Sequence, residues 1–575
     1  MPIRCSNGFL ILLLSTFPFL SILGCDQKEP NGSKEPDTPI ETPQKPVPVP
    51  EEEPLAGKPI DGARIGWDYS SQVTLDEDGG CYARIIRLQD GTHMAAYETA
   101  GGVYIKRSTD AGASWSDKAV VIDYYFEGGI RVNAANAEIC QLSDGTLLCG
   151  ANFRPSAEGI APWSIAVSRS EDGGKSWTAA DIIYEADIYS SNGCWEPYFL
   201  ELPDGKVHVY FANEKHYSKS SEQEISCMIS SDKGKTWDKK VRTVSFRKGF
   251  RDGMPVARVF NNQIVVTIED NIYGNFVPFT VRCPLSDPWA EPVTADSECR
   301  EQALVEDIQN NQTYGGAPYL LKLPSGDAVM SYQRAYGNDW QMSDMEVVIG
   351  DKEARNFARP SRPFKVTSGG SCLWNSVGLI DESHIVAVGS LNLGKSTIPV
   401  VKKGRVMANL QIQKEKVTSL PIFVGSESDS KVNAGVAHTS SDILIEIDVK
   451  DKTPYIGRGN SDGVHIYIDP VNKAWSELYS GVYRIWLPIS GYAEISEWRD
   501  SKWSTIESIR AVKNDTADGY SISATVPKAI LGEINSNQIR IGLTLYDYDH
   551  NGNFLDEDLV DMARNAPCTW LPLSF

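Results

Sequence analysis

One eight-residue pattern occurs three times in the first half of this 575-residue chain. It reads Ser-x-Asp-x-Gly-x-x-Trp, and its copies span residues 108–115, 170–177 and 230–237. The Asp carboxylate is suited to accept hydrogen bonds from nearby backbone N–H groups, the Gly permits a left-handed backbone, and the Trp can pin the turn to a sheet. Because the copies lie about sixty residues apart, they predict a repeat fold.

A second pattern, a strand–turn–strand unit, recurs six times with a similar spacing. Each copy is rich in apolar residues around a polar turn, which we expect to have two residues, as in tight β-hairpins. The copies are Arg84–Glu98, Glu138–Arg154, Glu196–Glu214, Pro255–Glu269, Pro318–Arg334 and Ser376–Ser390. Four short strands fit one repeat, so the sequence predicts a six-bladed β-propeller over residues 58–413. An array of β-sandwiches is the alternative.

The eight-residue pattern resembles the Asp-box, or BNR repeat, of sialidase-type propellers. This resemblance implies an all-β propeller fold for the first part of the chain. It implies little about activity, because the box is a structural feature of the blade.

The net charge of the chain is −21, which disfavours nucleic acids and anionic membrane surfaces as partners and suits neutral sugars. The seven histidines show no His-Glu-x-x-His spacing and the 11 cysteines form no Cys-x-x-Cys pair, so we predict no catalytic metal or other cofactor for catalysis. Cys140 and Cys149 are equally far from the turn at Asp144-Gly145. We expect them to face each other across the hairpin, either as a disulfide or as two small buried side chains.

The N-terminus has the pattern of an export signal. A basic residue, Arg4, precedes the apolar stretch Phe9–Leu23, which is too short for a comfortable membrane span. The stretch ends in Leu-Gly-Cys25, which resembles a bacterial lipobox and implies that Cys25 is acylated; an ordinary secretory peptide is the alternative. Residues 26–57 alternate proline with acidic and polar residues and should form an extended tether. We therefore expect an outer-membrane lipoprotein at the cell surface, a monomer held to the membrane only by its lipid.

Charged residues occupy the ends of the predicted hairpins that open on one face of the propeller. They are Arg84, Glu98, Glu138, Arg154, Glu196, Glu214, Glu269 and Arg334. Six hairpins converge there, so we expect a carboxylate-rich pocket on the axis; the alternative is a solvated rim. The residues that we predict to bind substrate are Arg84, Glu138, Arg154, Trp195 and Arg334.

Two of these carboxylates suit glycoside hydrolysis, which needs one proton donor and one nucleophile or base. Glu196 lies near the start of the third hairpin, and Glu269 lies at the end of the fourth. Neighbouring blades would bring them to one side of the pocket. Trp195 could provide a stacking face for a sugar, or an apolar wall that raises a carboxyl pKa.

The segments Trp195–Pro197 and Gly253–Val256, with a second glutamate about seventy residues beyond the first, resemble the exo-arabinanases of glycoside hydrolase family 93. This resemblance covers the propeller only. It implies exo-acting cleavage of an arabinan-like polysaccharide by a retaining mechanism. We assign Glu196 as acid/base and Glu269 as nucleophile, and the sequence leaves the exchange of these roles open.

Two other functions compete with this one. A sialidase would use an arginine triad and a tyrosine nucleophile; Arg84 matches the arginine that opens the first blade, but the proline of that segment and the acidic Asp of the next loop are absent. Tyr314, Tyr332 and Tyr336 are the nearby tyrosines. The third candidate is a non-catalytic surface lipoprotein that binds glycans.

After residue 413 the sixty-residue period ends, and alternation predicts a β-sandwich over residues 414–575. The expected strands are Ile443–Val449, Val464–Ile468, Val482–Ile489, Tyr520–Val526 and Ile539–Tyr546. Local segments resemble a family 9 carbohydrate-binding module, which implies sugar binding by aromatic faces; a structural sandwich is the alternative. The candidate aromatic residues are Trp475, Trp486, Trp498, Trp503 and Trp570.

A calcium-type spacing follows the last of these strands. Asp547, Asp549 and Asn551 alternate before Gly552, and Asp558 comes eleven residues after Asp547. Oxygen ligands at alternate positions around a glycine turn are what Ca²⁺ requires. The sequence thus predicts either a structural Ca²⁺ site or a solvated acidic turn.

Overall fold

The structure is a computed structural model in which residues 64–575 are described apart from short gaps. The gaps are residues 69–70, 306–312, 337–338, 365, 367–368, 383, 393, 395, 408, 423, 426–429, 458–459, 476, 536, 550, 560–564, 566 and 568–569. The export signal, Cys25 and the whole of the predicted tether lie outside the described residues. No helix among the described residues is long and apolar enough to cross a membrane.

The chain from Arg64 to Met407 builds six antiparallel sheets, the blades. Blade 1 contains β3 (Cys81–Arg87), β4 (His93–Thr99), β5 (Gly102–Ser108) and β6 (Ala119–Ile122). Blade 2 contains β7 (Tyr125–Glu127), β8 (Ile130–Gln141), β9 (Leu147–Pro155), β10 (Ser164–Ser170) and β11 (Asp181–Glu185). Blade 3 follows the short helix η2 (Ser190–Asn192) and contains β12 (Cys194–Glu201), β13 (Val207–Asn213), β14 (Glu224–Ser230) and β15 (Arg242–Ser245).

Blade 4 contains β16 (Asp252–Phe260), β17 (Gln263–Asp270), β18 (Val277–Pro284) and β19 (Arg300–Gln302). Blade 5 contains β20 (Thr313–Lys322), β21 (Ala328–Tyr336), the short helix η3 (Trp340–Met342), β22 (Asp344–Gly350) and β23 (Ala358–Ser361). Blade 6 contains β24 (Ser371–Leu379), β25 (His384–Asn392), β26 (Thr397–Met407), β1 (Arg64–Trp67) and β2 (Val73–Thr74).

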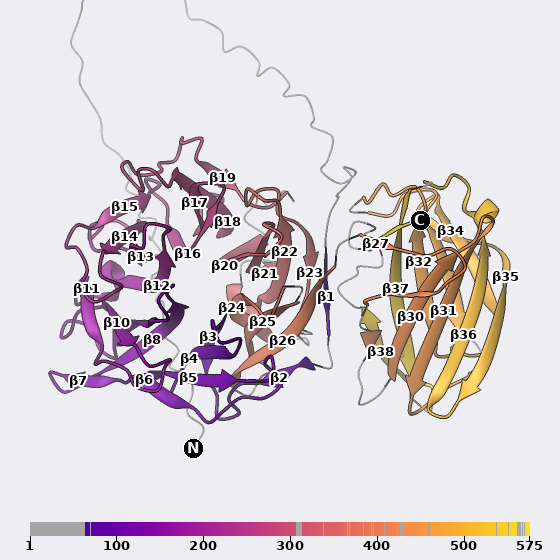
Figure 1. The fold of residues 1–575 in the computed structure, drawn as a ribbon, viewed down its shortest axis with the longest axis horizontal. Coiled ribbons are helices and arrows are strands. Elements are labelled where there is room, and N and C mark those ends of the chain that lie inside the picture. The colour runs from indigo at the N-terminus through magenta and orange to yellow at the C-terminus, as the bar shows by residue number, and fades with distance from the viewer. Residues whose placement is uncertain are drawn as a thin grey trace, which may run out of the picture. The chain divides into compact units, whose positions relative to one another are not determined.

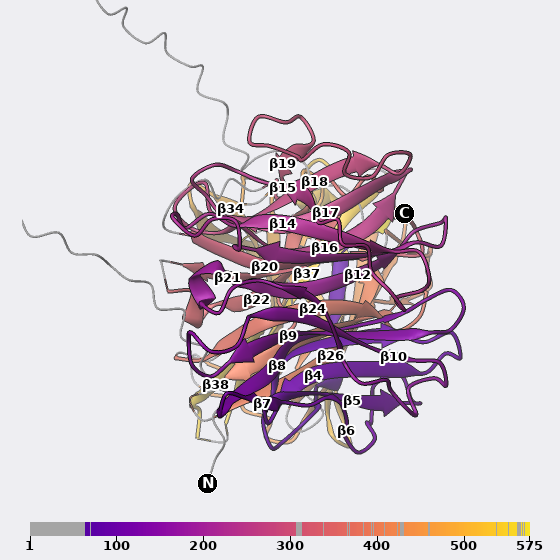
Figure 2. The same cartoon turned by 90° about the vertical axis from the view of Figure 1, so that its left-hand side faces the viewer.

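The six blades surround a common axis, as Figure 1 shows from the front and Figure 2 from the side. The strands nearest the axis are β3, β8, β12, β16, β20 and β24; each contacts the next, and β24 contacts β3. The ring is therefore closed, and the predicted six-bladed propeller is confirmed. Blades pack on both faces, so their inner strands are largely buried; β13 is buried at every position.

The ring is closed by a strand that the sequence did not predict. The four residues of β1 pair with β26, from Arg64 opposite Met407 to Trp67 opposite Gly404. Trp67 is fully buried, and its indole N–H donates a hydrogen bond to the Ser361 hydroxyl of blade 5 at 3.0 Å. The beginning of the propeller is thereby fastened to its end.

The hairpin loops differ in length from the prediction. In blade 2 the Leu142 N–H donates to the Thr146 carbonyl, so the loop has three residues and ends in Gly145 with φ +91°. The same loop forms around Gly91, Gly205 and Gly326. The glycine is required because the third loop residue adopts a left-handed backbone. Blade 4 has the two-residue turn, at Asn261-Asn262 with φ values of 43° and 62°.

The additional loop residue shifts the pairing register by one. Cys149 therefore pairs with Ile139, and Cys140 pairs with Leu148. Successive residues of a strand point to opposite faces, so the two cysteines do not face each other. The predicted facing pair is wrong, and both cysteines are free thiols.

Each Asp-box lies in the loop between the last two strands of its blade: β5 and β6, β10 and β11, and β14 and β15. In the third box the Ser230 hydroxyl donates to Asp232 at 2.8 Å and accepts the Gly234 N–H at 2.8 Å. Asp232 also accepts the backbone N–H and the hydroxyl of Thr236, at 2.8 and 2.6 Å. The other two boxes contain the same bonds. The Ser or Thr before the Trp, which the eight-residue pattern leaves unspecified, is thus part of the box.

The chain from Leu410 to Ser574 builds a second body of thirteen strands. They are β27 (Leu410–Gln411), β28 (Thr418–Ser419), β29 (Val424–Gly425), β30 (Ser430–His438), β31 (Asp442–Asp451), β32 (Gly463–Asp469), β33 (Tyr483–Pro488), β34 (Ala493–Arg499), β35 (Lys502–Thr516), β36 (Gly519–Pro527), β37 (Gln538–Tyr548), β38 (Phe554–Leu559) and β39 (Leu571–Ser574), with the short helix η4 (Lys528–Leu531) after β36.

A single long strand joins the two sheets of this body. The first half of β35 pairs with β34 and its second half pairs with β36. The core between the sheets is apolar and includes Ile445, Ile466, Ile485, Leu543 and Trp570. The predicted β-sandwich is confirmed, and the five expected strands fall on β31, β32, β33, β36 and β37.

Candidate active site

Every strand nearest the axis is interrupted by a β-bulge at the same place. The pairing register of each breaks around one residue, which has a left-handed backbone with φ between 48° and 59° although it is not glycine. We call these six residues the axial ring: Tyr82, Asn136, Glu196, Met254, Ala317 and Trp374. Bulges redirect side chains, and left-handed non-glycine residues are strained and concentrate at functional sites.

The residues of the axial ring meet across the axis. Tyr82, Met254, Ala317 and Trp374 pack into one apolar cluster, although they come from four different blades. The Tyr82 hydroxyl lies 3.7 Å from the Met254 sulfur. Glu196 is the only acidic member of this ring.

A second level of residues fills the axis beneath the ring, two positions further along each strand. These residues are all buried: Arg84, Glu138, Tyr198, Val256, Tyr319 and Ser376. Arg84 Nε lies 3.5 Å from the Glu138 carboxylate, and the Arg84 guanidinium stacks on the Tyr319 ring at 4.9 Å. The Tyr319 hydroxyl donates to Glu138 at 3.4 Å, and burial raises the pKa of Glu138 to about 7. Contacts between opposite blades therefore close the axis at this level.

Glu196 is partly exposed and surrounded by polar groups of blades 2 and 4. One of its oxygens accepts the Met254 N–H at 3.1 Å. Burial raises its pKa, and the positive charges of Arg154 and Arg251 oppose that rise. Arg251 is held by Glu214 at 2.6 Å, and Glu214 also accepts the indole N–H of Trp195 at 2.9 Å.

Glu269 lies opposite Gly253 in the β16–β17 ladder and is also partly exposed. One of its oxygens accepts the Ala317 N–H at 2.7 Å. Burial, and then the negative charge of Glu196, raise the pKa of Glu269 to about 8. Glu196 accepts a hydrogen bond from Met254, and Glu269 lies opposite Gly253. The two carboxyl groups therefore flank the dipeptide Gly253-Met254.

The hydrogen bond from Ala317 to Glu269 belongs to a pattern that repeats around the ring. Glu98 accepts the Asn136 N–H at 2.8 Å, Gln333 accepts the Trp374 N–H at 2.6 Å, and Ser390 accepts the Tyr82 N–H at 3.0 Å. Each acceptor lies on the second strand of one blade and binds the bulged residue of the next. Glu269 therefore has a structural role that Glu98, Gln333 and Ser390 share.

An ion-pair cluster in blade 4 fixes the ends of both strands beside Glu269. Arg300 donates to Asp252 at 2.9 Å and to Asp270 at 2.7 Å, and all three side chains are buried. Arg247 also donates to Asp270, at 2.8 Å. Asp252 precedes Gly253 and Asp270 follows Glu269, so the cluster holds the Glu269 backbone in place. This cluster and Arg251 were not among the residues predicted from the sequence.

The remaining residues predicted to bind substrate lie at different depths. Arg154 donates to Asn152 at 2.7 Å and its guanidinium lies 5.2 Å from the centre of the Trp195 ring, next to Glu196. Trp195 in turn contacts Trp163, with 4.7 Å between ring centres. Arg84 and Glu138 pair beneath the ring, and Arg334 is buried 3.4 Å from Glu346 within blade 5. Only Arg154 and Trp195 are thus neighbours of a predicted catalytic carboxylate.

The predicted calcium loop forms a turn in the second body. Asp549 accepts the N–H groups of Asn551 and Asn553, both at 2.8 Å, so its carboxylate caps the turn. Asp547 is buried on β37, and the side chain of Asp558 lies outside the described residues. The proposed ligand set of the loop stays a prediction.

Comparison with known families identifies the propeller repeats. Residues 90–249 and 145–346 match the BNR repeat-like domain. No curated protein matches the chain.

Solved structures with a similar fold include proteins of several kinds. One is a protein of unknown function from Dyadobacter fermentans, with 16% identity, 61% of this chain and 99% of that chain covered, and a TM-score of 0.44. A second is an α-L-arabinanase of Penicillium chrysogenum complexed with arabinobiose, with 19% identity, coverage of 61% and 98%, and a TM-score of 0.45. A third is a sialidase of Trypanosoma rangeli, with 13% identity, coverage of 86% and 97%, and a TM-score of 0.40.

Proposed function

We propose, from the premise that residues 90–346 belong to a BNR-repeat propeller, that the protein is a glycoside hydrolase whose catalytic groups are Glu196 and Glu269. One observation carries the proposal: two partly exposed carboxyl groups with raised pKa values flank Gly253-Met254 on the axial ring. Hydrolysis of a glycosidic bond needs such a pair, with one group protonated and the other ionised.

The charges around the two carboxyl groups favour a division of roles opposite to the first assignment. Glu269, whose pKa is about 8, suits the proton donor to the leaving oxygen. Glu196 faces Arg154 and Arg251, which favour its ionised form, so it suits the nucleophile at the anomeric carbon. In the second step Glu269 would take a proton from the water that releases the sugar.

The finer proposal is exo-action on an arabinan-like polysaccharide. It rests on the segments Trp195–Pro197 and Gly253–Val256, which contribute Glu196 and its hydrogen-bond donor Met254. The paired rings of Trp163 and Trp195 beside Arg154 offer an aromatic surface on which a sugar could stack. We further propose that the enzyme is carried on the outer membrane through an acylated Cys25.

A sialidase is the second candidate, and Tyr314 is the observation in its favour. Tyr314 is partly exposed. Burial, and then the charges of Glu269 and Glu196, raise its pKa, so a tyrosine and a carboxylate lie close together. The arginines that a sialidase would use to bind the carboxylate of its substrate are already engaged with other groups. Arg84 is engaged with Glu138 and with three backbone carbonyls, and Arg334 with Glu346.

The test is turnover by Glu196→Gln and Glu269→Gln variants of the purified enzyme on arabino-oligosaccharides and on sialosides. We expect wild type to release sugar from arabino-oligosaccharides, and each variant to lose about a hundredfold or more in kcat/KM. Glutamine keeps an oxygen that can accept the Ala317 or Met254 N–H, so the fold should survive. Binding of the oligosaccharides without turnover by wild type would contradict the proposal.

An aryl arabinoside with a nitrophenol leaving group separates the two roles, because such a leaving group needs no proton. Glu269→Gln should retain much more activity on it than on the oligosaccharide, whereas Glu196→Gln should lose both. Glu98→Gln is the matched control, since Glu98 occupies the equivalent position of blade 1 and binds a bulge N–H in the same way. The control should keep wild-type turnover.

If wild type releases sialic acid from sialosides and Tyr314→Phe does not, the result would support the sialidase instead.

A further inference from the structure

The core of the second body ends in carboxylates on three strands. The core-facing residues of β31 are Ile443, Ile445, Ile447, Val449 and then Asp451. Those of β37 are Ile539, Ile541, Leu543, Leu545 and then Asp547. In β32 the apolar series Val464, Ile466 and Ile468 is preceded by Asp462 in the same alternation. The alternation of each strand thus places an acidic residue at a position that faces the apolar core.

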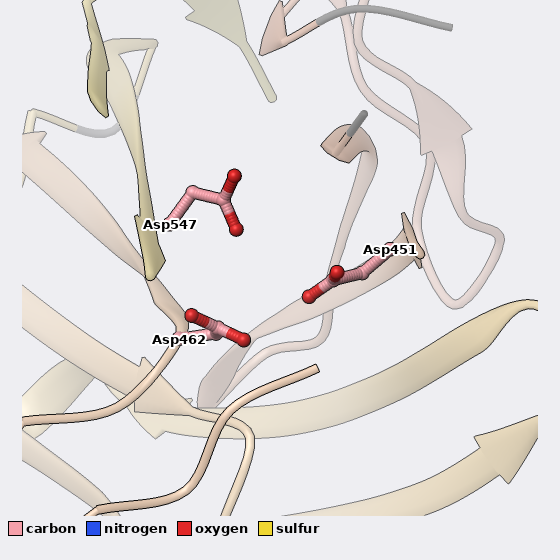
Figure 3. A group of neighbouring side chains, drawn as sticks. All are labelled: Asp451, Asp462 and Asp547. Carbon is pink, nitrogen blue, oxygen red and sulfur yellow. The ribbon is translucent and has the colours of Figure 1, made fainter. Parts of the chain in front are cut away.

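These carboxylates converge from both sheets of the sandwich. Asp451, Asp462 and Asp547 are exposed by only 4%, 1% and 6%, and each contributes an oxygen that lies within 4.8 Å of the other two. Figure 3 shows the three side chains directed toward one another. Burial and the charge of Asp451 raise the pKa of Asp462 to about 7, against hydrogen bonds from the N–H groups of Tyr455 and Tyr548. Three carboxylates this close together repel one another unless protons or a cation neutralise them.

A tyrosine hydroxyl lies in the same place. Tyr520 opens the core-facing series of β36 opposite Val449, so its side chain enters the core on the face that carries Asp451. The residue is fully buried, and its hydroxyl has no hydrogen-bond partner among the described residues. The charges of Asp462, Asp451 and Asp547 all act on this hydroxyl. It supplies a fourth buried oxygen directed at the acidic cluster, and such groups normally have a partner.

We propose that Asp451, Asp462 and Asp547 bind a calcium ion that links the two sheets of the C-terminal sandwich, with the Tyr520 hydroxyl beside it. The donor set consists of oxygen atoms alone, which suits a hard cation. Two ligands on opposite sides of Ca²⁺ lie about 4.8 Å apart at a Ca–O distance of about 2.4 Å, so three oxygens that all lie within 4.8 Å of one another are close enough to bind one ion. This set shares Asp547 with the predicted loop and replaces Asp549, which caps its own turn.

The experiment measures calcium binding to the mature full-length protein after treatment with a chelator. We expect Ca²⁺ to bind in titration calorimetry and to raise the unfolding temperature of the second body by about 5 °C or more at about a hundred times Kd. Asp451→Asn and Asp547→Asn should weaken binding about tenfold or more. In the metal-free protein the same variants should unfold at a higher temperature than wild type, because they relieve repulsion between carboxylates. A role limited to packing would not produce this reversal.

Asp448→Asn is the matched control, since Asp448 lies on the exposed face of the same strand and loses the same charge. It should bind Ca²⁺ as wild type does. The proposal is overturned if Ca²⁺ leaves the wild-type unfolding temperature unchanged, or if Asp448→Asn and Asp451→Asn respond equally. It is also overturned if only Asp549→Ala abolishes binding, which would assign the ion to the loop.

Discussion

At the scale of single residues, the carboxyl of Glu269 combines a structural and a chemical role. One oxygen accepts the Ala317 N–H, as Glu98 does for Asn136 in blade 1. What distinguishes Glu269 is that burial and the charge of its neighbour Glu196 raise its pKa. Substitution by glutamine separates the two roles, because it preserves the acceptor and removes the titratable proton.

The raised pKa of Glu269 predicts how the free energy of unfolding depends on pH. Its pKa is about 8 in the folded protein and near 4.5 when unfolded, so between these values the folded state binds more protons. The free energy of unfolding should therefore fall as the pH rises from about 5 to about 8. Glu269→Gln should make this fall shallower, as measured by urea unfolding at a series of pH values. Glu138, with a pKa of about 7, leaves part of the slope in the variant. An equally steep fall in Glu269→Gln would mean that Glu269 is ionised in the folded protein.

The sequence was informative about residues that lie within a local pattern. Glu196 and Glu269 could be placed at neighbouring strand ends because the hairpin repeat locates those ends. Arg251 and Arg300 could not, since they lie outside the hairpins and reach the site only through the pairing of strands within and between blades. Acidic core positions such as Asp451 were also missed, because the alternation of a strand does not show which sheets face each other.

At the scale of the structural element, the repeated unit is the bulge together with its acceptor on the preceding blade. Gln333 is buried and accepts the Trp374 N–H at 2.6 Å. Gln333→Met keeps the volume and removes the acceptor, so we expect a loss of about 1–3 kcal/mol in the free energy of unfolding. Urea denaturation measures it.

Ser331→Ala is the control for that substitution. Ser331 lies two residues earlier on β21, is fully buried, and its hydroxyl has no hydrogen-bond partner among the described residues. Its removal should therefore be nearly neutral. If Gln333→Met is as stable as Ser331→Ala, the acceptor does not stabilise the bulge.

Hairpins were easier to predict than their register. Polar turns between apolar runs located the loops of the blades, but loops of two and three residues look alike when both contain a glycine. The difference of one residue is enough to place Cys140 and Cys149 on opposite faces of the strand pair. The bulges leave no local signal either, because residues as different as Tyr82, Ala317 and Glu196 adopt the same left-handed backbone.

At the scale of the whole molecule, the sixty-residue period predicted the ring, and a four-residue strand closes it. The period could not reveal β1, since its partner β26 lies at the far end of the propeller sequence. Trp67 packs against Gly404, where a side chain on that glycine would approach the indole to 2.5 Å. The closure therefore depends on a large residue facing the smallest one.

Trp67→Ala should cost about 3–5 kcal/mol, because it empties a fully buried site at the closure. Calorimetric unfolding should show the loss in the transition of the propeller. Trp67→Phe keeps most of the packing and should lose less. An alanine variant that unfolds at the wild-type temperature would show that the ring does not depend on β1.

The pairing of β1 with β26 also decides how the molecule bears mechanical load. Arg64 lies opposite Met407, so the chain that precedes β1 and the chain that follows β26 leave this ladder from the same end. Tension between the N-terminal segment and the C-terminal body would therefore peel the two strands apart one pair at a time, beginning at Arg64 and Met407. The first part to yield would be the seam of the ring, while the blades that carry Glu196 and Glu269 would bear none of the pull.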